Sequence, residues 1–242
     1  MMKFIFWQKL FCIVLCLSFL TCHEKKENTI YVNNSTDQYI SYRFLALGDS
    51  YTIGESVCDT CRWPAQLKTA LENEMTNTNI SLSIIAQTGW TTTNLLQAIS
   101  EASTSNNYNL VSLLIGVNNQ YQGKPFSLYE TEFVELLDIA VAKAGGDNAK
   151  VIVVSIPDYA FTPFGQSMSN PSQITADLIN YNAFAESVCA ERNISFVNIT
   201  DITQEGLNTS SLVATDGLHP SETAYVLFVE RLLPVAKSIL MN

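Results

Sequence analysis

The sequence predicts an α/β fold in which helices cover both faces of one mostly parallel, five-stranded sheet. Three observations predict it. Short apolar runs alternate along the chain with longer segments of helical periodicity. The run at residues 151–156 is continuously apolar, as expected of a strand that is buried on both faces. The chain has 242 residues, of which 47% are hydrophobic, and this suits one sizeable core without internal repeats.

Five short apolar runs, each followed by turn-forming residues, are predicted as strands. They span residues 44–47, 80–86, 110–115, 151–156 and 195–199. Each run is followed, after a turn or a loop, by a predicted helix. This order favours parallel strands that are joined by right-handed crossovers.

Five longer segments have helical periodicity and recognisable ends. Pro64 opens the first of them, at a position that proline favours. The others span residues 92–102, 128–144, 171–192 and 221–240. Gly145 suits the end of the helix before it, and Ser221 is the expected N-cap of the last helix. Pro234 is expected to kink that helix.

The N-terminus predicts an export signal. Two lysines precede an apolar run at residues 10–20, which is too short to span a bilayer. The residues that follow are polar and rich in Asn, Ser and Thr, as is typical of a flexible tether. We therefore expect a signal peptide at 1–21, a tether at 22–41 and a folded domain at 42–242.

Cys22 directly follows the apolar run and resembles the acylated first residue of mature bacterial lipoproteins. The Phe-Leu-Thr before it is bulkier than usual, so an ordinary signal peptide with an unmodified Cys22 stays the alternative. The protein is expected in the bacterial cell envelope, as a periplasmic or surface lipoprotein, or secreted. Any membrane attachment would be through an N-terminal lipid anchor.

Charge and cysteine spacing limit the partners. A formal net charge of −10 opposes binding to nucleic acid, which needs clustered Lys and Arg. Cys58 and Cys61 have the spacing of redox or metal-binding pairs, but no second pair or nearby histidine completes a metal site. In an exported protein a disulfide between them is favoured, with free thiols or redox chemistry as alternatives. Nothing in the sequence indicates an oligomeric state.

Ser50 lies in a Gly-Asp-Ser turn directly after the first predicted strand. A serine hydroxyl becomes a nucleophile when a base takes its proton. Of the two histidines, His23 lies in the charged stretch after the apolar run, so His219 is the expected base. Asp216 precedes His219 by three residues, and one tight turn would bring its carboxylate to Nδ1 and leave Nε2 facing Ser50.

Acyl transfer through serine also needs donors for the charge that builds on the carbonyl oxygen. The backbone N–H groups of Ser50 and Gly89 and the side-chain amide of Asn118 are the candidates. All three follow predicted strands, and active residues of parallel sheets lie in the loops beyond the strands' carboxyl ends. We therefore expect these residues to form an oxyanion hole.

At these residues the chain resembles the SGNH hydrolases, also called GDSL esterases and lipases. The four family blocks occur in order, as Ser50 in Gly-Asp-Ser-Tyr, Gly89 in Thr-Gly-Trp-Thr, Asn118 in Gly-Val-Asn-Asn and His219 in Asp-Gly-Leu-His-Pro. The resemblance implies a flavodoxin-like three-layer α/β/α sandwich, hydrolysis of esters or thioesters, and no metal or other cofactor. One block departs from the family, which often has aspartate where this chain has Asn119.

The predicted function is a serine esterase that cleaves acyl or acetyl esters of lipids, glycans or small alcohols through an acyl-enzyme. Trp90 and the loop aromatics Tyr159, Phe161 and Phe164 are candidates for the substrate-binding wall, with core packing as the alternative. The same triad would also serve an acyltransferase. A non-catalytic glycan- or lipid-binding protein of the envelope, built on the same fold, is the alternative from another class. No motif indicates the acyl chain length or the leaving group.

Overall fold

The computed structural model describes residues 39–242. The predicted signal peptide, Cys22 and almost all of the predicted tether lie outside these residues. Within them, five strands form one sheet in the order β2-β1-β3-β4-β5, and every neighbouring pair is parallel. The strands are β1 (Ile40–Gly48), β2 (Thr78–Ala86), β3 (Leu110–Leu114), β4 (Val151–Val154) and β5 (Ser195–Val197).

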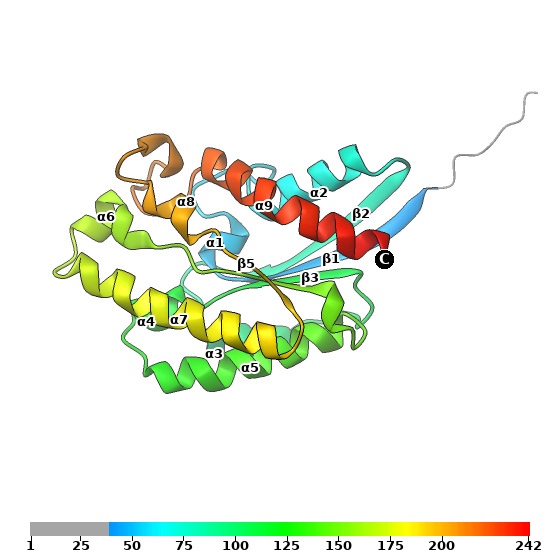
Figure 1. Cartoon of the computed structure of the whole chain (residues 1–242), viewed down its shortest axis with the longest axis horizontal. Helices are drawn as coiled ribbons and strands as arrows, with labels where there is room; N and C mark the ends of the chain where they lie inside the picture. Colours follow the sequence, from blue (N-terminus) through cyan, green and yellow to red (C-terminus); the bar gives the residue numbers. More distant parts are fainter. Residues whose placement is uncertain (1–38) are drawn as a thin grey trace, which may run out of the picture. The chain divides into compact units, whose positions relative to one another are not determined.

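Helices cover both faces of this sheet, as Figure 1 shows. One layer contains α2 (Trp63–Glu74) and α9 (Glu222–Met241), and the other contains α3 (Thr92–Glu101), α5 (Phe126–Lys143) and α7 (Pro171–Glu191). Shorter helices follow the strands: α1 (Ser50–Ile53), α4 (Val117–Tyr121), α6 (Pro163–Gln166) and α8 (Thr200–Gln204). Single 3-10 turns are η1 (Asn148–Lys150), η2 (Tyr159–Phe161) and η3 (Ser210–Leu212). The predicted three-layer α/β/α architecture is confirmed.

The core lies on both faces of the three central strands. Every residue of β3 and β4 is buried, as is the part of β1 from Phe44 to Gly48. This burial explains why the strands read as continuous apolar runs, since a parallel sheet covered on both faces has no solvent side. None of the helices within residues 39–242 is long and apolar enough to cross a membrane.

The folded part begins earlier than the boundary predicted at residue 42. β1 starts at Ile40, which pairs with Thr78, and Ser41 pairs with Asn79. Strand pairing uses backbone groups, so it extends into the end of the polar stretch that was expected to be tether, whatever the side chains there. At the other end of the chain, Ser221 caps α9 as predicted, and the helix continues through Pro234.

Candidate active site

Ser50 is the first residue of α1 and lies at the carboxyl edge of β1. The capping residue Asp49 accepts a hydrogen bond from the Tyr51 amide at 3.1 Å. Gly48 permits the sharp exit from the strand, because a Cβ at this position would lie 2.4 Å from the Leu114 carbonyl oxygen. The Gly-Asp-Ser turn therefore presents the serine where the edges of β1 and β3 meet.

Asp216 and His219 form a compact acid–imidazole pair in the turn before α9. The Nδ1 atom of His219 lies 2.6 Å from Oδ2 of Asp216. The other carboxylate oxygen, Oδ1, accepts the backbone N–H groups of Leu218 at 2.9 Å and His219 at 3.0 Å. Gly217 allows the tight turn with a φ of +73°. One short segment thus holds both ends of the carboxylate, as the spacing predicted.

The pKa of Asp216 is set by two opposing effects. Burial of the carboxyl alone would raise the pKa, but hydrogen bonds from Ser56, the His219 ring and two backbone amides lower it more. The net result is a pKa well below the ordinary range of an aspartate. Asp216 is therefore ionised wherever the protein is folded near neutral pH, and it can stabilise an imidazolium.

His219 and Ser50 are both buried and line the same cavity. Asp216 occupies Nδ1 of the ring, so Nε2 is the nitrogen left for the serine. The Tyr51 ring packs edge-on against the imidazole at a centroid distance of 5.8 Å. Among the described residues no hydrogen bond joins Ser50 to His219, and such contacts commonly tighten only when substrate binds.

The predicted oxyanion donors Gly89 and Asn118 line this cavity together with Ser50. Gly89 has a φ of +84°, and its carbonyl accepts the Gln122 side-chain amide at 3.1 Å. The Asn118 Nδ2 atom donates to the Trp90 carbonyl at 3.0 Å. An amide nitrogen carries two N–H bonds, so this contact fixes the group and leaves its second N–H for a ligand.

Asn119 has a structural use for its amide where the family often has aspartate. The side chain is fully buried, and its Oδ1 accepts the Thr92 backbone N–H at 2.9 Å. Its Nδ2 donates to the Thr92 hydroxyl at 2.7 Å. A carboxylate could accept the first bond but could not donate the second. Asn119 therefore ties the start of α3, just after the Gly89 turn, to α4.

The cavity has a volume of about 300 Å³. Besides Ser50 and His219, it is lined by Tyr51, Thr88, Gly89, Val117, Asn118, Tyr121, Tyr159, Phe164 and Leu218. Three aromatic rings form one wall, with the Tyr121 centroid 6.2 Å from that of Tyr159 and 6.1 Å from that of Phe164. The wall is apolar, while the donors and the serine lie on the rest of the lining.

Two of the predicted substrate residues lie elsewhere. Phe161 lines a separate surface groove with Pro171, because the tight turn of η2 sends it to a different side from Tyr159. The Trp90 side chain packs against the core, and only its carbonyl serves the site, as acceptor for Asn118. Tyr121 was missed, since α4 is too short for its periodicity to indicate a face.

Residues 46–227 match the GDSL-like Lipase/Acylhydrolase family. The chain belongs to this family. It is a carboxylic ester hydrolase. A search of curated protein sequences finds no match.

Solved structures share the fold of this GDSL-like hydrolase at low sequence identity. A lipolytic protein of the G-D-S-L family from Veillonella parvula is 19% identical with a TM-score of 0.63, over 81% of this chain and 98% of that one. The psychrotrophic esterase EstA from Pseudoalteromonas sp. is 20% identical with a TM-score of 0.59, over 83% and 100%. An acetyl xylan esterase from Geobacillus stearothermophilus is 17% identical with a TM-score of 0.60, over 83% and 96%.

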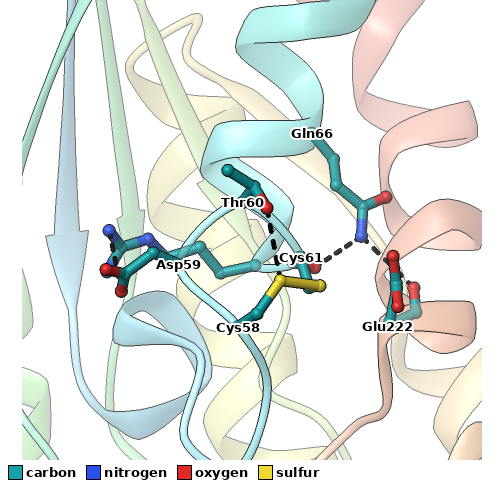
Figure 2. The surroundings of a disulfide bond; sticks show 7 residues. Cys58, Asp59, Thr60, Cys61, Gln66 and Glu222 are labelled. Carbon is teal, nitrogen blue, oxygen red and sulfur yellow. Dashed lines mark hydrogen bonds and ion pairs between the residues drawn. A yellow bond between two sulfur atoms is a disulfide. The ribbon is translucent and has the colours of Figure 1, made fainter.

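In this GDSL-like hydrolase a disulfide joins Cys58 to Cys61 in the loop between α1 and α2 (Figure 2). Cys189 is a buried free thiol. Within residues 39–242 no group of three His, Cys, Asp or Glu side chains is arranged to hold a metal ion.

The loop between α1 and α2 also contains Ser56, which the sequence did not single out and which contacts Asp216.

Proposed function

We propose that this GDSL-like hydrolase is a serine esterase that works through an acyl-enzyme intermediate. The observation that carries the proposal is the shared cavity of Ser50, His219 and the two candidate oxyanion residues Gly89 and Asn118, with Asp216 bound behind the imidazole. A nucleophile, a base, an orienting carboxylate and fixed donors are the parts that acyl transfer requires.

In the proposed reaction the Ser50 hydroxyl attacks the ester carbonyl carbon while Nε2 of His219 takes its proton. The carbonyl oxygen becomes an anion, which the N–H groups of Ser50, Gly89 and Asn118 stabilise. Collapse of this intermediate breaks the bond to the alcohol, which receives the proton from His219. A water molecule then attacks the acyl-enzyme by the same route, and the acid is released.

The cavity favours esters of small, uncharged acyl groups. Its volume of about 300 Å³ is at the low end of ligand pockets, and its Tyr121, Tyr159 and Phe164 wall suits a hydrocarbon chain. The net charge of −10 opposes the approach of anionic substrates. A short acyl ester of a neutral alcohol or glycan therefore fits better than a long-chain or acidic lipid.

A chain-length series of p-nitrophenyl esters tests this function. Wild type should release free acid most efficiently from acetate and butyrate. Phe164→Ala opens the apolar wall and should raise kcat/KM for octanoate relative to acetate roughly tenfold. Phe161→Ala removes a ring from the same loop outside the cavity and is the matched control. Absence of turnover with every ester, or the same selectivity change in both variants, would overturn the proposal.

We also propose that the protein is exported, with Cys22 as the site of lipid attachment. The N-terminal apolar run supports export. The Cys58–Cys61 disulfide supports it independently, since such bonds persist in oxidising compartments. Metabolic labelling with a clickable fatty acid, compared between wild type and Cys22→Ser, distinguishes an anchored protein from a secreted one.

A further inference from the structure

The loop between α1 and α2 reaches from the proposed nucleophile to the proposed acid. Six residues after Ser50, the hydroxyl of Ser56 donates a hydrogen bond to Oδ2 of Asp216 at 2.7 Å. The same oxygen accepts Nδ1 of His219 at 2.6 Å. The two backbone donors bind the opposite oxygen, Oδ1. Ser56 is thus the one side chain besides His219 that binds this carboxylate among the described residues.

The backbone of Ser56 indicates that its position is specifically maintained. Its φ is +66°, in the left-handed region that favours glycine. Within residues 39–242 the other non-glycine residues with positive φ are Asn77 and Asn193, and asparagine tolerates this conformation better than serine does. Ser56 is also exposed, so burial does not hold its side chain in place. A strained conformation of this kind persists where surrounding contacts impose it.

The part of the loop that follows Ser56 is itself fixed by a disulfide and by hydrogen bonds to α2 and α9. The disulfide closes the turn at Cys58–Cys61 two residues after Ser56. Figure 2 shows Gln66 of α2 next to this turn, where its Nε2 donates to the Cys61 carbonyl and, at 3.3 Å, to the Glu222 carbonyl. Glu222 begins α9, three residues after His219. The disulfide turn and the histidine segment are therefore held by one glutamine.

The residue before Ser56 binds the other side of the cavity. Glu55 accepts a hydrogen bond from the hydroxyl of Thr88, which lines the cavity next to Gly89. The loop thus contacts both the segment that carries the proposed acid and the segment that carries the proposed oxyanion glycine. Neither Glu55 nor Ser56 is among the residues that line the cavity.

We propose that Ser56 is a positioning residue for ester hydrolysis and that the Cys58–Cys61 disulfide holds it against Asp216. The inference rests on the proposed function, because it requires Asp216 to orient His219. Without the Ser56 hydroxyl, the imidazole is the one partner left to Oδ2 among the described residues, while Oδ1 keeps its two backbone donors. The Oδ2 side of the carboxylate can then tilt more freely about the Cβ–Cγ bond. The imidazole then spends less time facing Ser50, which lowers kcat and leaves substrate binding unchanged.

Two variants separate positioning from a structural role. Ser56→Ala removes the hydroxyl and keeps the strained φ, whereas Ser56→Gly removes the hydroxyl and relieves the strain. Both should lower kcat for p-nitrophenyl acetate about tenfold with KM unchanged, as loss of a hydrogen bond to a charged group would do. The Tm should be higher for Ser56→Gly than for Ser56→Ala. Asn193→Gly relaxes a positive φ far from the site and should keep wild-type kcat.

The disulfide is tested in the same assay. Cys58→Ser/Cys61→Ser should lower kcat by about the same factor in the wild-type background and by little more when Ser56→Ala is already present. The inference would be overturned if either Ser56 variant kept wild-type kcat, or if the change were confined to KM. It would also be overturned if kcat across the variants followed Tm, or if the hydroxyl and the disulfide had independent effects on kcat. Ser50→Ala distinguishes the two proposals: turnover in that variant refutes the nucleophile, whatever Ser56 does.

Discussion

Replacing Ser50 by alanine is expected to lower kcat for p-nitrophenyl acetate by roughly 10⁴-fold or more. The variant keeps the cavity and the oxyanion donors but has no atom that can form the acyl-enzyme. Activity should be measured on purified protein with unchanged Tm. Ser100→Ala is the matched control, because the hydroxyl of this exposed serine of α3 donates to the Gln97 carbonyl, within its own helix, and the variant should keep wild-type kcat.

His219→Ala should cost about as much as Ser50→Ala, and the double variant should be little worse than either, because the two groups act in one step. Multiplicative losses in the double variant, or wild-type kcat in His219→Ala, would contradict His219 as the base.

A large effect of pH on folding stability is expected from Asp49, the capping residue beside the nucleophile. The side chain is fully buried, and its Oδ2 has no hydrogen-bond partner among the described residues. Burial raises its pKa to about 8, although the hydrogen bond from the Tyr51 amide acts the other way. Burial also holds the pKa of the neighbouring Tyr51 and Tyr225 above the ordinary value, so both stay neutral. Asp49 is therefore expected to be uncharged in the folded protein at neutral pH.

This buried carboxyl should make the protein less stable as the pH rises. The folded state keeps the Asp49 proton up to pH of about 8, whereas the unfolded chain releases it near pH 4. The contribution of Asp49 to the free energy of unfolding is thus complete below about pH 4. It falls by up to about 1.4 kcal/mol per pH unit from there toward pH 8. The effect of Asp216 on stability changes with pH in the opposite direction. Because its pKa is lowered in the folded state, Asp216 stabilises the protein above the pKa of the unfolded chain, and this contribution is lost in acid.

Urea unfolding at several pH values between 5 and 8 tests the role of Asp49. The free energy of unfolding of wild type should fall relative to that of Asp49→Asn, which has the same shape and cannot ionise. Asp59→Asn removes an exposed carboxylate of the disulfide turn and is the matched control. Parallel pH dependence in wild type and Asp49→Asn, or a steeper fall in the asparagine variant, would show that Asp49 is already ionised.

Local hydrogen bonding made part of this site predictable from sequence. The contact between Asp216 and His219 is built within one turn, and the residues Asp-Gly-Leu-His specify that turn directly. The strands were equally accessible, because burial on both faces leaves a continuous apolar run. The start of β1 was not predictable, since Ile40 and Ser41 join the sheet through backbone pairing with β2, whatever their side chains.

Contacts between distant segments explain what the sequence did not indicate. Ser56 and Asp216 are 160 residues apart, and no local pattern marks an exposed loop serine as a partner of that carboxylate. Tyr159 and Phe161 look alike in the sequence, as aromatic residues of one loop. The direction of η2 places Tyr159 at the cavity and Phe161 at a separate groove. Asn119 became interpretable only through its two contacts with Thr92.

Covalent labelling tests the proposed nucleophile most directly. A fluorophosphonate forms a phosphorus–oxygen bond with an activated serine and releases fluoride, so mass spectrometry of the digest locates the modified residue. We expect one label, on the peptide that contains Ser50. It should be absent in Ser50→Ala and form much more slowly in His219→Ala. A label on another serine, or equal labelling of wild type and Ser50→Ala, would contradict Ser50 as the nucleophile.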